Sequence, residues 1–170
     1  AGAAFGVQTR AGECGVAVGN NATTAEFGVA VGANALAGQD AFSVSEGKHT
    51  TAIGGEEWAT EDGATVVGYN SYAQAQNSTV LGSNTWTTKE ADNSVALGAG
   101  SLADRANAVS VGAAQEWTDA AGVTHVAIAR QITNVADGTE ATDAVNKRQL
   151  DAVAEVAGER AGDPLPPADG

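Results

Sequence analysis

A five-residue phrase that recurs about every fourteen residues constrains this chain more than any other feature. The phrase reads small, aliphatic, small, aliphatic, glycine, and its clearest copy is Ser94-Val95-Ala96-Leu97-Gly98. The copies occupy residues 15–19, 28–32, 43–47, 50–54, 64–68, 78–82, 94–98 and 108–112. Their closing glycines are 13, 15, 7, 14, 14, 16 and 14 residues apart. A short fixed period of this kind predicts an architecture of stacked repeats.

Each repeat has the alternation of a β-strand. The two aliphatic residues of a copy lie two positions apart, so they share one face of a strand while the small residues share the other. The closing glycine permits positive φ and a sharp turn. A second, shorter stretch with alternating alanine follows, as at 72–75 and 100–103. Two short strands and two turns per repeat predict an all-β fold, a narrow parallel β-roll whose coils stack at about 4.8 Å.

We expect the aliphatic residues of the phrases to fill the thin lumen of this roll. The small-residue face of the strands then stays open. We expect another copy of the chain to cover it, because oligomerisation commonly completes a core that is too thin. The predicted strand core consists of Val16, Val18, Val29, Val31, Val67, Leu81, Val95, Leu97, Val109 and Val111.

Two stretches depart from the regular period. Residues 1–14 precede the first full phrase, and Phe5-Gly6-Val7 resembles Phe27-Gly28-Val29, which predicts an imperfect first coil. The interval of 7 between Gly47 and Gly54 predicts an irregular turn half a unit long.

The composition narrows the possible functions. A formal net charge of −13 argues against a nucleic-acid partner, because phosphate binding needs a basic face. No apolar run of roughly twenty residues is present, so nothing in the sequence predicts a membrane span. No charged and apolar leader precedes the repeats, so we expect any export signal to lie outside this chain.

The repeats end at residue 112, and three further segments follow. Residues 113–129 predict a hairpin-like insertion around Ala121-Gly122. Residues 130–150 end in a predicted helix start, with Thr142 as N-cap and Asp143 in the first turn. Residues 151–170 contain the rest of the helix and a tail that we expect to be disordered over its last eight or so residues.

The predicted helix carries an apolar stripe. It runs from Val145 through Leu150, Val153, Val156 and Ala157 at helical spacing. We expect Gly158, Gly162 and the prolines at 164, 166 and 167 to end the helix. A helix of about three turns is marginal alone in water, so the stripe predicts partner helices from other copies of the chain.

Few residues suggest chemistry. His49 and His125 have no cysteine or carboxylate at metal-ligand spacing, which predicts exposed histidines rather than metal ligands. The acidic pairs Glu56-Glu57 and Glu61-Asp62 flank Trp58, and we interpret them as an acidic loop with at most weak affinity for a cation. We therefore expect no catalytic residue, no cofactor and no metal.

The three tryptophans are unusual in a chain of small residues. Trp58, Trp86 and Trp117 either fill gaps under loops or stand out as contacts for a ligand, and the sequence leaves both possibilities open.

Two motifs together resemble one family. The Ser-Val-Ala-Leu-Gly repeat resembles the YadA-like head of trimeric autotransporter adhesins, and the segment from Arg130-Gln131-Ile132 to residues 143–150 resembles the neck that follows such heads. The resemblance covers about residues 1–157. It places these residues in the neck and at the trimer contact: Arg130, Gln131, Ile132, Asp143, Ala144, Val145, Asn146, Gln149 and Leu150.

The resemblance implies a left-handed parallel β-roll in each of three subunits and a neck that leads to a coiled-coil stalk. It also implies display on the outer membrane of a Gram-negative bacterium, held by a C-terminal β-barrel anchor that this chain does not contain. The implied function is attachment to host cells or extracellular-matrix proteins, and possible self-aggregation, without catalysis.

Three alternatives stay open. A β-solenoid enzyme acting on polysaccharide requires a cleft with convergent acids, which the repeats do not display. An ice-binding solenoid requires threonines in register on every coil, and pairs such as Thr50-Thr51 do not recur in that way. A structural spacer within a larger adhesin agrees with the same sequence.

Overall fold

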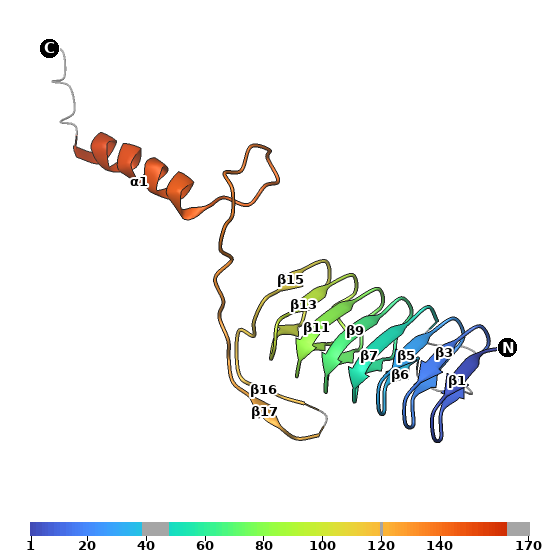
Figure 1. The fold of residues 1–170 in the computed structure, drawn as a ribbon. Helices are drawn as coiled ribbons and strands as arrows, with labels where there is room; N and C mark the ends of the chain where they lie inside the picture. The colour runs from blue at the N-terminus through green and yellow to red at the C-terminus, as the bar shows by residue number, and fades with distance from the viewer. Residues whose placement is uncertain (39–47, 120, 163–170) are drawn as a thin grey trace, which may run out of the picture. The chain divides into compact units, whose positions relative to one another are not determined.

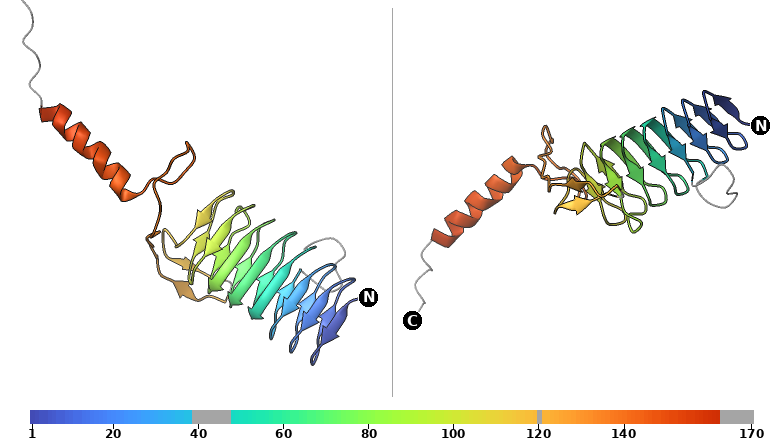
Figure 2. Two further views of the ribbon diagram at one scale, coloured as in Figure 1. Left: turned by 45° about the horizontal axis from the view of Figure 1, so that its top comes forward. Right: turned by 90° about the horizontal axis from the view of Figure 1, so that it is seen from below.

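The computed structural model describes residues 1–38, 48–119 and 121–162. The chain forms two compact units, Ala1–Arg130 and a second unit that begins at Gln131. In the first unit, successive coils stack along one axis to form a narrow roll with two parallel sheets as its walls (Figure 1; Figure 2). This confirms the predicted parallel β-roll.

The first wall, sheet A, contains the strands of the repeated phrase. Each strand pairs in parallel with the strand of the next coil, so equivalent residues such as Val66 and Val80 lie side by side. The described strands, in sheet order, are β1 (Ala3–Phe5), β3 (Val16–Val18), β5 (Val29–Val31), β7 (Thr51–Gly55), β9 (Thr65–Tyr69), β11 (Thr79–Ser83), β13 (Val95–Leu97) and β15 (Val109–Ser110).

The second wall, sheet B, contains the shorter strands. These also pair in parallel, and β10 and β14 fall in the two stretches of alternating alanine that predicted them. The described strands are β2 (Arg10–Ala11), β4 (Thr23–Thr24), β6 (Leu36–Ala37), β8 (Trp58–Ala59), β10 (Tyr72–Ala73), β12 (Trp86–Thr87) and β14 (Leu102–Ala103). Because β1 and β2 pair with β3 and β4, the predicted first coil within residues 1–14 is also confirmed.

The closing glycines bring the coils into close contact. Gly54 has a φ of 135°, and a Cβ atom added there would lie 1.9 Å from the carbonyl oxygen of Gly68 in the next coil. No other residue type fits such a position, because the backbone conformation and the neighbouring carbonyl both exclude a side chain.

The lumen is filled by the small residues, which corrects the predicted strand core. Ala17, Ala30, Ala52 and Ala96 are fully buried, and Ala37, Ala59 and Ala73 face them from sheet B. None of the ten predicted core residues is buried in the subunit: Val16, Val18, Val29, Val31, Val67, Leu81, Val95, Leu97, Val109 and Val111 lie on the outer face or at its edge. The physical reason is volume, since two sheets joined by tight turns leave no room for two facing rows of valine and leucine.

One corner of the lumen carries hydroxyl groups. The Ser71 hydroxyl donates to the carbonyl oxygen of Gly82 at 2.8 Å, and the Thr85 hydroxyl donates to that of Gly98 at 2.9 Å. Glu57 occupies the equivalent corner of the preceding coil, fully buried, and neither carboxylate oxygen has a hydrogen-bond partner. Burial raises the pKa of this carboxyl to about 8.

The step from β5 to β7 is longer than the other steps between neighbouring strands of sheet A. β5 pairs directly with β7, with Val29 opposite Thr51, so this coil advances by 22 residues instead of adding a half unit. The phrase at 43–47 lies outside the described residues.

The insertion after the repeats contains an antiparallel pair, β16 (Trp117–Thr118) and β17 (Thr124–His125), as the hairpin-like pattern predicted. An isolated bridge between Ala113 and Ile128 joins its two ends. Arg130 then returns to the last coil, where its guanidinium donates to the carbonyl oxygens of Val111 and Ala99.

The second unit contains one helix, α1 (Lys147–Gly162). The helix begins later than predicted, because Asn146 and not Thr142 is the N-cap. The Asn146 Oδ1 accepts from the backbone N–H of Gln149 at 3.1 Å, and the Gln149 Oε1 accepts from the backbone N–H of Asn146 at 3.4 Å, which is a capping box.

Of the residues expected to end the helix, Gly158 lies within α1 and Gly162 is its last residue. A glycine within a helix costs about 1 kcal/mol and does not by itself end it. The expected disordered tail falls at 163–170, outside the described residues. Within the described chain, α1 is too short and too polar to cross a membrane.

Glu57 makes stability depend on pH. The folded-state pKa of about 8 exceeds the ordinary value of 4.5, so the folded state keeps a proton that the unfolded state releases. This contribution to stability is fully present below pH 4.5 and decreases by roughly 1.4 kcal/mol per pH unit until the pH passes 8. We predict that Glu57→Gln removes the decrease, measured as the free energy of unfolding between pH 4.5 and 8.

The matched control is Glu56→Gln, which changes an exposed neighbour and should leave the pH dependence unaltered. A Glu57→Gln protein that loses stability with pH as steeply as the unmodified chain would contradict the assignment.

Candidate binding surfaces

The outer face of sheet A carries a continuous row of apolar side chains, which we call the aliphatic ladder. Its members share one register position in successive strands and are between 36% and 65% exposed. They are Phe5, Val18, Val31, Ile53, Val67, Leu81 and Leu97. A continuous exposed apolar row of this length indicates a surface that another molecule covers.

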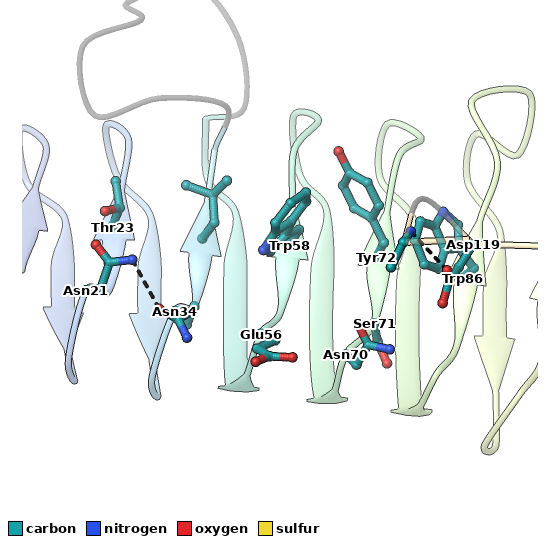
Figure 3. A pocket seen from close by; sticks show the side chains of 13 residues that line it. Asn21, Thr23, Asn34, Glu56, Trp58, Asn70, Ser71, Tyr72, Trp86 and Asp119 are labelled. Carbon is teal, nitrogen blue, oxygen red and sulfur yellow. Dashed lines mark hydrogen bonds between the residues drawn. The ribbon is translucent and has the colours of Figure 1, made fainter. Parts of the chain in front are cut away.

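The outer face of sheet B carries aromatic side chains in register. Trp58, Tyr72 and Trp86 lie opposite one another in β8, β10 and β12, one repeat apart. The ring centroids of Trp58 and Tyr72 are 5.2 Å apart, and those of Tyr72 and Trp86 are 5.0 Å apart, with the rings edge to face. Figure 3 shows the three side chains standing in a row across neighbouring coils.

A polar rim runs beside the aromatic row. The Asn21 Nδ2 donates to the Oδ1 of Asn34 at 3.1 Å. In the same way, the Asn70 Nδ2 donates to the Oδ1 of Asn84 at 2.8 Å. These asparagines have φ between 50° and 58°, a conformation that asparagine tolerates better than most residues. Glu56, with a φ of 60°, takes the equivalent place between the two pairs and is exposed.

Trp117 closes one end of the row. Its ring lies edge-on to Trp86, with centroids 5.6 Å apart, and stacks on the ring of His125 at 4.2 Å. The ring is half-buried, and its Nε1 is buried without a hydrogen-bond partner. Trp117 therefore packs between the hairpin and the roll.

The hairpin is held by a contact between His125 and Asp119 that the sequence did not predict. His125 was expected to be exposed, but its side chain is only 13% exposed and its Nε2 lies 2.9 Å from Asp119 Oδ2. Burial alone would raise the pKa of the Asp119 carboxyl. Hydrogen bonds from His125 and from the backbone N–H groups of Val123 and Ala121 outweigh burial and hold this pKa below its ordinary value.

The aromatic row, the polar rim and the hairpin line an open groove with a volume of about 590 Å³, which we call the aromatic groove. It extends along the roll from Thr23 to Trp86 and ends at Asp119 and Ala121 of the hairpin (Figure 3). Its lining combines apolar rings with a few amide and carboxylate groups, which suits binding of an extended ligand.

The other residues considered for chemistry do not converge. His49 is exposed and stacks on Phe27, with ring centroids 5.1 Å apart. Asp62 accepts a hydrogen bond from the backbone N–H of Lys48, and Glu57 is buried in the lumen. Among the residues that the structure describes, no three histidine, cysteine or carboxylate side chains form a cluster that could hold a metal.

The neck residues divide into two groups. The first group is polar and folds the segment back onto the start of α1. Asp143 Oδ2 accepts from the backbone N–H groups of Thr139 and Glu140. The Gln149 Oε1 accepts from the backbone N–H of Gly138, and the Gln149 Nε2 donates to the carbonyl oxygen of Gly138, both at 3.0 Å. Asn146 also donates to the carbonyl oxygen of Val135.

The second group is apolar and exposed. Ile132, Val145 and Leu150 are more than 60% exposed, and Val153 and Val156 continue the stripe along α1. Gln131 and Ala144 are exposed as well, whereas Arg130 belongs to the first unit. The apolar group is therefore available to other chains.

Sequence reasoning missed Tyr72, which joins Trp58 to Trp86. The signal was present, because residues 58, 72 and 86 are spaced by one repeat and must lie on the same face of neighbouring coils. The contact between Asp119 and His125 had no comparable signal, since a hairpin of unknown register does not specify which side chains meet.

Comparisons with known proteins agree with this architecture. The YadA head domain repeat matches in two copies, at residues 59–85 and 90–114, and the coiled stalk of trimeric autotransporter adhesin matches residues 131–163. Comparison with curated protein sequences gives no match.

A solved structure is similar over most of the chain. The crystal structure of the collagen-binding domain of the Yersinia adhesin YadA has a TM-score of 0.73 and 32% sequence identity to this chain. The similarity covers 91% of this chain and 75% of that one. The chain belongs to the YadA-like trimeric autotransporter adhesins, a family displayed on bacterial surfaces, and comprises head repeats followed by the start of a stalk.

Proposed function

We propose that this chain is the head and neck of a homotrimeric adhesin that attaches a bacterium to extracellular-matrix protein, with collagen as the first candidate. The similarity to a collagen-binding domain at 32% identity is the observation that carries this proposal. Binding takes place on the outer surface of the head, and no catalytic step is assigned. In the full-length protein, an outer-membrane β-barrel anchor holds the trimer at the cell surface.

The aliphatic ladder forms the trimer contact in the head. Its side chains are apolar and remain exposed in a single subunit. Burial between subunits would contribute about 25 cal/mol for each Å² of apolar surface removed from water. A cyclic arrangement of three chains covers the same face on every subunit.

The exposed apolar residues of the neck and of α1 form a second contact between chains. Leu150, Val153 and Val156 recur at helical spacing, which suits a coiled coil of three helices. The polar residues Asp143, Asn146 and Gln149 act within each chain by fixing the start of the helix.

Trimerisation also serves attachment. Three identical heads on one stalk present the same surface three times, so weak contacts are multiplied by a high effective concentration.

We predict that the unmodified chain has about three times its mass of 16.8 kDa in light scattering at micromolar concentration. Val67→Glu with Leu81→Glu places two charges on the aliphatic ladder, and Leu150→Glu with Val153→Glu does the same on α1. Either pair should lower the melting temperature, and the four substitutions together should give a monomer, because buried like charges repel.

Val123→Glu is the matched control, since Val123 is an exposed aliphatic residue of the hairpin. It should leave mass and melting temperature unchanged. A monomeric unmodified chain, or ladder variants as stable as the control, would rule out the proposed contact.

We further predict that the trimer binds immobilised collagen. The monomeric variant should bind at least about 100-fold more weakly, because it loses the gain from multivalency. Surface plasmon resonance on collagen, fibronectin and laminin measures both proteins. A trimer that binds none of the three matrix proteins would overturn the attachment function and favour a structural spacer.

A further inference from the structure

The aromatic groove lies on sheet B, whereas the proposed trimer contact lies on sheet A, so the two surfaces occupy different walls of the roll. Figure 3 shows Trp58, Tyr72 and Trp86 in the groove, with Asn34 and Glu56 at the nearby turns. Trp58 is 44% exposed despite its size. Packing within the subunit therefore accounts for Trp117 but leaves much of Trp58 uncovered.

The groove offers hydrogen-bond donors that the described part of the chain does not use. In the part of the chain that the structure describes, the indole N–H groups of Trp58 and Trp86 and the hydroxyl of Tyr72 have no hydrogen-bond partner. The Asn34 side chain uses its Oδ1 to accept from Asn21, which leaves its N–H groups for a ligand. A ligand that fits this surface must supply acceptors beside apolar surface.

The charge of the groove restricts the ligand further. Among the described residues that line it there is no lysine, arginine or histidine, and the carboxylates are those of Glu56 and Asp119. Asp119 is already paired with His125, so of these two Glu56 is the carboxylate available to a ligand. With a net charge of −13 on the chain, an anionic ligand is disfavoured and a neutral or basic one is favoured.

The shape of the groove suits an extended chain. It crosses the strands β4, β6, β8, β10 and β12, which at about 4.8 Å per coil corresponds to a length of roughly 19 Å. A polyproline II helix rises about 3.1 Å per residue, so some six residues would fill this length.

We propose that the aromatic groove binds a proline-rich peptide segment in the polyproline II conformation, with an arginine or lysine of the segment beside Glu56. Such a segment has carbonyl acceptors that make no internal hydrogen bonds, and its prolines have no N–H. The proline rings of the segment pack between the aromatic side chains of the groove, as in other aromatic-lined grooves that recognise proline-rich segments. A neutral sugar chain is less suitable, because it has no positive charge to pair with Glu56.

The inference rests on the proposed attachment function, because it assigns the face of the head and the chemistry of the matrix segment that it contacts. The probe is a twelve-residue peptide of Pro-Pro-Arg repeats, labelled for fluorescence anisotropy and titrated with the complete chain. We expect saturable binding with a Kd below about 1 mM. A peptide with alanine in place of proline keeps the charge but not the preformed helix, and should bind at least about tenfold more weakly.

Two variants locate the binding. Trp58→Ala should weaken it about thirtyfold, as truncation of a central aromatic contact does. Tyr72→Phe removes one donor and should weaken binding about fivefold. Tyr69→Phe is the matched control, because Tyr69 is the other tyrosine of the chain and does not line the groove. Circular dichroism checks that each variant keeps its fold.

The outcomes separate this inference from the attachment function. Absence of peptide binding, binding that Trp58→Ala leaves unchanged, or groove-dependent binding of cellohexaose instead of the peptide would overturn the inference. Collagen binding by the trimer would still support attachment through another surface in each of those cases. Peptide binding that depends on Trp58 and Tyr72 supports the groove even if intact collagen is not bound.

Discussion

The narrow lumen of the roll is the constraint on which the rest of the structure depends. Neighbouring coils approach so closely that a Cβ atom at Gly32 would lie 1.6 Å from the carbonyl oxygen of Gly54. Alanine, serine and threonine fill most of the interior, and Val66 and Val80 are the largest apolar side chains fully buried among the described residues. Every larger apolar side chain of the strands must therefore lie outside.

This exclusion creates two surfaces from one repeat. The long strand of each coil adds an aliphatic residue to sheet A, and the short strand adds a residue to the outer face of sheet B. Parallel pairing in register turns each contribution into a continuous row along the roll. The aliphatic ladder suits self-association, because it lacks polar groups that a hydrophilic ligand would recognise. The aromatic row lies beside asparagines, so it suits a ligand with both apolar surface and hydrogen-bonding groups.

The period of the sequence was sufficient to predict the coils and their parallel pairing, because both depend on spacing alone. The hairpin was predicted separately, from the pattern around Ala121-Gly122. The period did not decide which face of a strand lies inside, because alternation only places Ala96 and Leu97 on opposite faces. The width of the lumen decides that the smaller residue, Ala96, is the one inside. The aromatic row was predictable from the spacing of Trp58, Tyr72 and Trp86. The burial of Glu57 was not, because its carboxyl lies in a corner that other coils fill with alanine, serine or threonine.

The most direct test of the narrow lumen compares two neighbouring residues of β13 by thermal unfolding. Ala96 is fully buried and Leu97 is 43% exposed. If the lumen accepts only small residues, Ala96→Leu overpacks it and destabilises the subunit by about 1–3 kcal/mol or prevents folding. Leu97→Ala should then keep the circular dichroism spectrum of the roll and weaken only the association of subunits. A chain that tolerates leucine at position 96 but loses its fold with alanine at position 97 would contradict this account.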